Sequence, residues 1–311
     1  MNYPTYFESK KTINLYGLFP DFNFLKELYT SDKLPHVLML SGNKGSGKAT
    51  LVNHLMHFIF DQNNYDVTNY KIIAESNFNK LFKNNIFSNI IYLSGSNLKN
   101  IKIDDIRDLK GVISQTSISN KKRFIILDDI ELFNKNSLNA LLKVIEEPRT
   151  NNYFILINNK SKPLIETIKS RCLEIKIILS NNIRLEIINS LTSYYKLNPT
   201  INVGLTSISP GSFLKYNYIC ESNKIDLNNS FLINLKIIMN LYKKEKDIIY
   251  IDLMLFFTHH YFNNLRFNKK LNNKKIIENK LFVLRNINSF FLYNLNQTAL
   301  LNTINNKITD E

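Results

Sequence analysis

Short, continuous apolar runs alternate with helix-like patterns in the first half of the chain. The runs cover residues 36–41, 90–93, 123–128 and 153–158. Such unbroken runs are typical of strands that are buried on both faces of a parallel sheet. Apolar residues recur at helical spacing at 51–60 and 138–145, after two of these runs. The alternation of strand and helix predicts an α/β layer.

The pattern changes in the second half. From Asn182 onward, apolar residues keep helical spacing, as in 231–242 and 251–261, and strand signals are almost absent. The C-terminal helical unit, from Leu227 to the end, is apolar on several faces, which fits either an interface with another chain or an ordinary bundle core. Residues 61–83, by contrast, are polar and Asn-rich, and predict only weak helical character.

Length and charge say less about the fold and function than the apolar pattern does. The chain has 311 residues, which is enough for two or three domains. Lys and Arg total 40 against 26 Asp and Glu, so the formal net charge is +14. A positive protein attracts phosphate backbones, but abundant Asn, Lys and Ile are also what an AT-rich genome encodes. A nucleic-acid partner and a solvated lysine surface therefore both remain open.

The two cysteines, Cys172 and Cys220, lie far apart in the sequence. They can build neither a disulfide framework nor a four-cysteine zinc site, so we expect a reducing compartment and no bound metal. The first twenty residues lack an apolar run typical of a signal peptide, and no later run has the length of a membrane span. We expect a soluble cytoplasmic protein with no membrane partner.

A phosphate-binding loop is predicted between the first apolar run and the first helix. Its G-x-x-x-x-G-K residues are Gly42, Asn43, Lys44, Gly45, Ser46, Gly47 and Lys48. A preceding strand and a following helix are the context that this motif requires, and its backbone N–H groups cradle phosphates while Lys48 reaches the β- and γ-phosphates. Ala49, however, replaces the Ser or Thr that binds Mg²⁺. Thr50 points elsewhere, since one residue turns a helix by about 100°. We predict a true phosphate-binding loop that has lost catalysis.

The apolar run 123–128 ends in acidic residues, which is the arrangement of a Walker B motif. Asp128 could hold Mg²⁺ through water. Asp129 stands where active ATPases of the AAA+ class have the Glu that polarises the attacking water, and it is one methylene shorter. Glu131 is expected to face away from the site. Acids that only end a strand and cap the next segment are the alternative interpretation.

A more specific resemblance comes from two motifs on either side of the run 154–158. Residues 138–148, which end in Glu-Glu-Pro, and Ser170-Arg171-Cys172 resemble the signature of the bacterial sliding-clamp loader, the AAA+ complex of the DNA polymerase III holoenzyme. The stretch from Ile103 to Pro148 also resembles this family continuously. The matches cover most of residues 1–215, and the last third is similar only as a helical segment of the right length.

The resemblance implies a three-part fold. The expected parts are an AAA+ α/β P-loop domain with a parallel sheet at 1–176, a small helical lid at 177–222 and an all-α collar for oligomerisation at 223–311. Asn158 or Asn159 then falls at the sensor 1 position, where a polar side chain contacts the γ-phosphate.

The hydrolysing subunit of that family has four features that this chain lacks. It keeps Ser or Thr after the P-loop lysine, Asp-Glu in Walker B, a four-cysteine zinc module, and an arginine after Gly-Ser in the lid. Here Ala49 follows the P-loop lysine, and Asp128-Asp129 replaces Asp-Glu. No cysteine lies between residues 60 and 90, and Leu214 stands at the end of the Ser-Pro-Gly-Ser-Phe-Leu stretch in place of the arginine. These departures resemble the delta prime type of subunit, a non-hydrolysing stator. They imply that ATP binds weakly or not at all and that zinc is absent.

By the same resemblance, Arg171 is an arginine finger that enters the ATP site of the adjacent subunit, where its planar guanidinium meets the γ-phosphate. A surface salt bridge is the alternative for this arginine. Cys172 is interpreted as a small apolar residue and not as a nucleophile. The implied partners are the ATPase subunits and the delta subunit of the loader and, through the complex, the sliding clamp and primed DNA.

Two other functions stay open. An active AAA+ ATPase, either the motor subunit of the loader or a related DNA-dependent enzyme, would hydrolyse ATP without partners. A P-loop kinase for a small molecule is disfavoured, because it should lack the Ser-Arg-Cys element and the all-helical tail.

Overall fold

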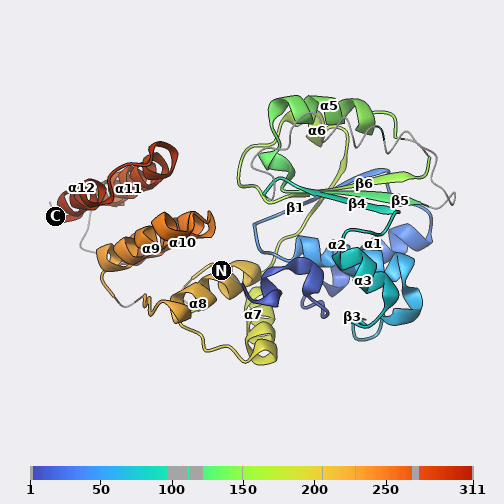
Figure 1. Ribbon diagram of the computed structural model, residues 1–311, viewed down its shortest axis with the longest axis horizontal. Coiled ribbons are helices and arrows are strands. Elements are labelled where there is room, and N and C mark those ends of the chain that lie inside the picture. Colours follow the sequence, from blue (N-terminus) through green and yellow to red (C-terminus); the bar gives the residue numbers. More distant parts are fainter. Residues whose placement is uncertain are drawn as a thin grey trace. The chain divides into compact units, whose positions relative to one another are not determined.

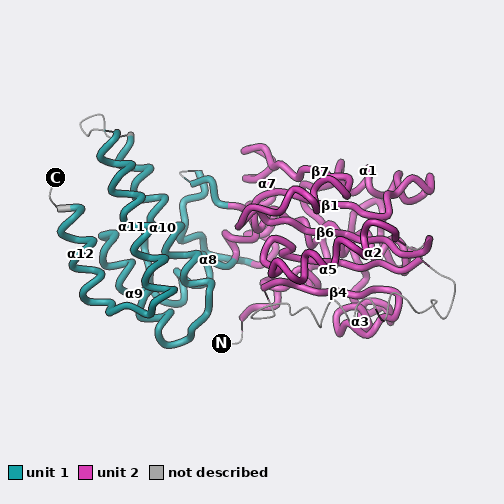
Figure 2. Tube along the Cα trace, turned by 90° about the horizontal axis from the view of Figure 1, so that it is seen from above, with its two compact units in different colours: residues 1–2, 196–208, 215–311 teal, residues 3–195, 209–214 magenta. Residues whose placement is uncertain are grey.

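The structure is a computed structural model that describes residues 3–96, 111, 122–148, 150–204, 206–227, 229–267 and 273–309. The chain forms two compact units (Figure 2). The first, the α/β unit, contains Tyr3–Tyr195 and Ser209–Leu214, and the second, the helical unit, contains residues 1–2, 196–208 and 215–311. A division into three domains at residues 176 and 222 stays a prediction.

A parallel sheet in the order β4-β5-β6-β1-β7 forms the centre of the α/β unit (Figure 1). Its strands are β1 (Val37–Ser41), β4 (Ile90–Ser94), β5 (Arg123–Asp128), β6 (Asn152–Asn158) and β7 (Leu173–Lys176). The four predicted strands are confirmed, and all residues of β1 and β6 are buried. Strand β7 was not predicted, because it alternates apolar and charged residues and is largely exposed at the edge of the sheet.

Helices cover both faces of this sheet (Figure 1). One face packs against α1 (Phe19–Thr30), α2 (Lys48–Phe60) and α3 (Asn77–Lys83), and the other against α5 (Lys135–Ile145) and α6 (Glu166–Lys169). Along β5, Phe124 and Ile126 join the apolar cluster of the α2 face, whereas Ile125 and Leu127 join the cluster of the α5 face. Because side chains alternate along a strand, Asp128 lies on the α2 face, next to the predicted phosphate-binding loop.

The weak helix predicted at residues 61–83 is wrong for most of that segment. It contains a 3-10 turn at Gln62–Asn64, a short antiparallel pair of β2 (Tyr65–Asp66) with β3 (Lys71–Ile72), and then α3. The Asp66 carboxylate accepts hydrogen bonds from the backbone N–H groups of the turn, and Tyr65 and Ile72 are buried. A turn-forming aspartate between two apolar anchors therefore overrides helical propensity here.

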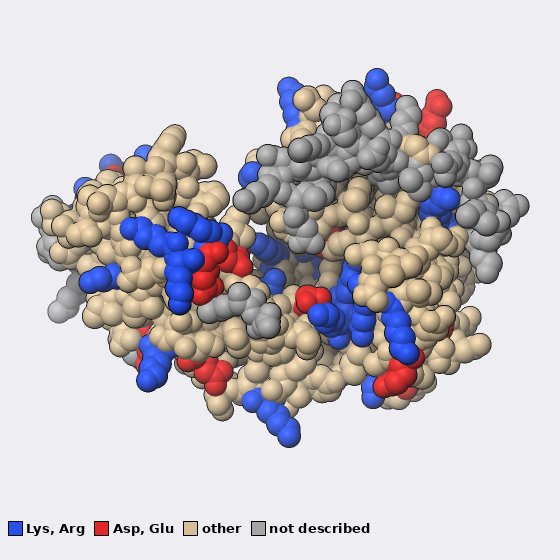
Figure 3. Space-filling model, viewed as in Figure 1, with Lys and Arg blue, Asp and Glu red and all other residues tan. Residues whose placement is uncertain are grey.

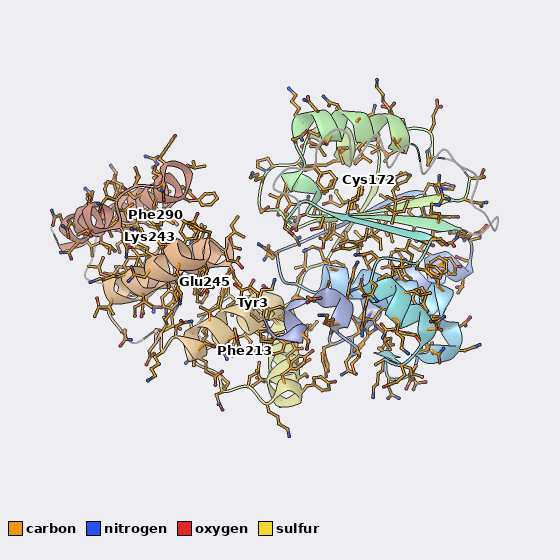
Figure 4. All side chains as sticks on the ribbon, viewed as in Figure 1. Tyr3, Cys172, Phe213, Lys243, Glu245 and Phe290 are labelled. Carbon is orange, nitrogen blue, oxygen red and sulfur yellow. The ribbon has the colours of Figure 1, made fainter. Side chains whose placement is uncertain are left out.

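Past β7, the described residues form helices only. They are α7 (Asn181–Tyr195), α8 (Pro210–Ser222), α9 (Phe231–Glu245), α10 (Ile249–Phe267), α11 (Asn273–Tyr293) and α12 (Gln297–Thr309). The predicted runs 231–242 and 251–261 are confirmed as α9 and α10. Within the helical unit, Phe290 of α11 (Figure 4) is buried, and its ring contacts that of Tyr242 of α9. None of the described helices has the length and apolarity of a membrane span.

Basic side chains occur in several separate groups on the face shown in Figure 3, with acidic side chains among some of them. On this face, the described Lys and Arg side chains therefore form no single continuous basic surface.

Candidate functional site

The predicted phosphate-binding loop connects β1 to α2, as the motif requires. Gly45 and Gly47 have φ angles of 80° and 93°, a left-handed backbone that side chains rarely adopt. Gly47 is the N-cap residue of α2. The glycines therefore give the loop the tight turn that places backbone N–H groups at the start of a helix.

The Lys48 side chain is folded back onto its own loop. Its Nζ donates to the carbonyl oxygens of Gly42 (2.8 Å) and Asn43 (2.7 Å) and contacts Ser46 Oγ at 3.3 Å. Burial lowers the pKa of Lys48 to about 8, although the charges of Asp128, Glu131 and Asp129 oppose this shift. A phosphate that entered the loop would have to replace the carbonyl groups as partners of this ammonium group.

The start of α8 holds the same loop from its carbonyl side. Ser209 Oγ donates to the Lys44 carbonyl (2.6 Å), and the Gly211 N–H donates to the Gly45 carbonyl (2.8 Å). A Cβ atom on Gly45 would lie 2.5 Å from Ser209 Oγ. We call these two hydrogen bonds the α8 latch. This Ser-Pro-Gly stretch was interpreted only through its resemblance to the family and its missing arginine, and its contact with the loop was not predicted.

Asp128 ends β5 on the α2 face, as predicted, but its carboxylate already has a partner. Its Oδ2 accepts a 2.6 Å hydrogen bond from the hydroxyl of Tyr92 on the neighbouring strand β4. Burial raises the pKa of Asp128, and the charge of Asp129 raises it further, while the Tyr92 hydrogen bond acts against the rise. Tyr92 was not predicted at the site. The signal available was a hydroxyl-bearing residue inside an apolar run.

Asp129 and Glu131 hold the loop that follows β6. The Asp129 carboxylate accepts a 2.7 Å hydrogen bond from the side-chain amide of Asn159. The expectation that Glu131 faces away is wrong, since this residue is buried and accepts from the Asn159 N–H (3.1 Å) and from Ser161 Oγ (2.8 Å). The positive φ of Asp129 (52°) turns the chain into a 3-10 helix, which brings Glu131 back to this loop.

Of the two sensor 1 candidates, Asn159 contacts the acid and Asn158 does not. Asn158 is buried in β6, where its carbonyl accepts from the Gly42 N–H (3.1 Å) and its side chain accepts from the Lys160 N–H (2.9 Å). It therefore reaches the phosphate-binding loop through its backbone. Ala49 packs against the apolar cluster of the α2 face and brings no hydroxyl to the loop.

Arg171 lies just after α6, and its side chain is 36% exposed. Its Nη2 forms a 2.8 Å ion pair with Glu146 Oε1, and its Nη1 donates to the Thr167 carbonyl at 3.0 Å. The salt bridge that was the alternative interpretation is thus present, on a side chain that stays accessible. The neighbouring Cys172 packs against the α5 face (Figure 4), and burial raises the pKa of its thiol to about 11. Of the family-like stretch from Ile103 to Pro148, residues 103–110 and 112–121 lie outside the described residues.

Comparisons with known proteins agree with these motifs. Residues 20–180 match the family described as DNA polymerase III, delta subunit. The DNA polymerase III subunit delta' of Pseudomonas aeruginosa is 40% identical over 76 residues, which are 24% of this chain and 23% of that protein. Subunit delta' of Haemophilus influenzae is 28% identical over 155 residues (50% and 46%), and subunit gamma of Buchnera aphidicola is 27% identical over 147 residues (47% and 39%). These matches span less than half the length of each relative.

A solved structure extends the likeness of fold. A DNA polymerase III gamma subunit-related protein from Thermotoga maritima aligns with 91% of this chain and 96% of its own, with a TM-score of 0.51 and 17% identity. The parallel sheet with helices on both faces and the helical C-terminal region confirm the predicted fold class. Because the family match covers just over half of the chain, the chain belongs to the family described as DNA polymerase III, delta subunit.

Proposed function

We propose that this chain is a non-hydrolysing stator subunit, of the delta prime type, in the DNA polymerase III clamp loader. The observation that carries the proposal is the state of the two Walker B acids. Asp128 accepts from Tyr92 and Asp129 accepts from Asn159, so both carboxylates have partners within the chain. Hydrolysis of ATP needs a carboxylate to hold Mg²⁺ and a group to orient the attacking water.

The phosphate-binding loop fits the same role. Ala49 supplies no hydroxyl for Mg²⁺, and the ammonium group of Lys48 is bound to the carbonyl groups of its own loop. The α8 latch holds the loop through two hydrogen bonds from the chain itself. In this proposal ATP binds weakly or not at all, and the α/β unit keeps its shape through contacts within the chain.

The chemical contribution of the chain would then be made to a neighbour. Arg171 is accessible, and its guanidinium has the geometry for binding a γ-phosphate in the ATP site of an adjacent loader subunit. The partners in this proposal are the ATPase and delta subunits and, through the complex, the sliding clamp and primed DNA in the cytoplasm. The chain would support ATP-driven opening of the clamp and its closure on DNA.

The test has two parts. The purified chain alone should show no Mg²⁺-dependent ATP turnover, and it should co-purify with the clamp-loader ATPase subunits of the same organism into a complex that native mass spectrometry detects. Turnover by the chain alone, at the rate of those ATPase subunits, would instead establish the second candidate function, an active AAA+ ATPase. The intact loop geometry with Lys48 favours that alternative.

A further inference from the structure

Glu146 lies at the end of α5, in the Glu-Glu-Pro motif, and has no role in the proposed function so far. It is the C-cap residue of this helix, and its N–H donates to the Leu142 carbonyl. A carboxylate at a helix C-terminus lies near the negative end of the helix dipole, where a cation is favoured. Arg171 supplies that cation through the 2.8 Å contact of Nη2 with Glu146 Oε1.

The guanidinium of Arg171 is thereby oriented by the ends of two helices. Nη2 meets Glu146 at the end of α5, while Nη1 donates to the Thr167 carbonyl in α6 and lies 3.4 Å from Ser170 Oγ. All of these groups belong to the α/β unit. An arginine side chain on a surface samples many rotamers, and a restraint from two directions reduces the entropy that it loses when it binds a ligand.

The restraint is also easily exchanged. The side chain of Glu146 is 45% exposed and that of Arg171 is 36% exposed, and an ion pair between such exposed groups contributes little to stability. A phosphate, which carries more charge than a carboxylate, can take over the guanidinium at small cost. The pair therefore orients the arginine without sequestering it.

We infer that Glu146 is a positioning residue for Arg171, and that it orients the guanidinium for the ATP site of the neighbouring subunit. This inference rests on the proposed function. Glu146 itself touches no phosphate in this account and acts only through Arg171.

The test compares variants of the full chain in the loader reconstituted with its ATPase and delta subunits. Glu146→Ala should lower kcat of the DNA-stimulated ATPase about two- to fivefold, which is the range that an exposed ion pair can supply, and should leave KM for ATP unchanged. Glu146→Gln, which keeps an acceptor oxygen but loses the charge, should fall between Glu146→Ala and the native chain. Glu147→Ala is the matched control, because Glu147 is exposed and has no ion pair within the described residues.

The decisive comparison uses the Arg171→Ala background. Arg171 is absent in this background, so Glu146→Ala should lower kcat no further if Glu146 acts only by positioning Arg171. A general structural role of Glu146 would lower kcat by the same factor in both backgrounds. Full activity of Glu146→Ala, or activity above that of the native chain, would overturn the inference while Arg171→Ala stays impaired. If Arg171→Ala itself has no effect, the proposed function fails first. Thermal melting checks that each variant folds. If Glu146→Ala does not fold, the kcat of Glu146→Gln tests the inference.

Discussion

Two regions of the α/β unit contain the motifs on which the proposed function depends, and they differ in how their charged side chains are bonded and exposed. At the phosphate-binding loop, Lys48, Asp128 and Asp129 each bind a group of the same chain. At the end of α6, Arg171 is accessible and is held by an exposed ion pair with Glu146 and a hydrogen bond to the Thr167 carbonyl. Buried charges need internal partners, whereas an exposed charge can exchange its partner at low cost. The difference favours a chain whose chemistry is directed at another subunit.

The largest effect should come from the accessible region. Arg171→Ala removes the proposed finger, and turnover at the neighbouring ATP site should fall about 10³-fold, as for fingers supplied in trans in GTPases. Single-turnover ATP hydrolysis by the reconstituted loader measures it. Lys169→Ala is the control, since it removes a nearby positive charge whose ion pair is with Glu166 and not with Glu146. Equal losses in both variants would mean that general charge, and not this arginine, matters.

A smaller effect is expected at the latched loop. Gly45→Ala places a Cβ 2.5 Å from Ser209 Oγ at a residue with a φ of 80°, so the free energy of unfolding should fall by about 2–3 kcal/mol. Urea unfolding of the chain measures this loss. Gly111→Ala is the control, because a Cβ there meets no atom of the described residues within 4 Å. An unchanged stability of Gly45→Ala would show that the α8 latch does not hold the loop.

Tyr92→Phe removes the hydroxyl that occupies Asp128. The free energy of unfolding should fall by about 1–2 kcal/mol, since a buried acid loses a hydrogen bond. At the same time, the released carboxylate should make nucleotide binding more dependent on Mg²⁺, as isothermal titration with and without the metal would show. Tyr293→Phe, on a ring that is 72% exposed, serves as the control. A binding curve that does not respond to Mg²⁺ would contradict this role of Tyr92.

The smallest effect concerns pH. The pKa of Lys48 is about 8 in the folded chain against 10.5 for an ordinary lysine, so between pH 8 and 10.5 the folded chain holds fewer protons than the unfolded chain. The contribution of Lys48 to stability therefore rises with pH across this window, whereas the affinity of the loop for a phosphate anion should fall, by about tenfold at pH 9. Binding of a fluorescent ATP analogue from pH 7 to 9.5 measures the fall. A Lys48→Arg variant keeps its positive charge over this pH range, so its affinity for the analogue should not fall.

The sequence was sufficient for features that depend on local pattern. The unbroken apolar runs predicted four strands, and the glycine spacing predicted the loop between β1 and α2. It was insufficient where position depends on register or on a single backbone angle. The contact of Tyr92 with Asp128 follows from the pairing of β4 with β5, and the inward turn of Glu131 follows from the positive φ of Asp129.

The same holds for the choice between neighbouring amides. Asn158 and Asn159 are identical in type and adjacent, so only the path of the chain at the end of β6 decides which one meets Asp129. The α8 latch could not be predicted for a related reason, since Ser209 and Lys44 are far apart in the sequence and no periodicity connects them.

The close approach of Gly211 to Gly45 has a consequence for how P-loop sequences are interpreted. A Cβ on Gly211 would lie 3.0 Å from the Gly45 Cα, and a Cβ on Gly45 would lie 2.8 Å from the backbone nitrogen of Ser212 in α8. The middle glycine of the motif is thus required by the packing of a helix, whether or not a phosphate ever binds. A mutational scan without any nucleotide would then still select glycine at this position. A glycine pattern of this kind is evidence for a fold before it is evidence for a ligand.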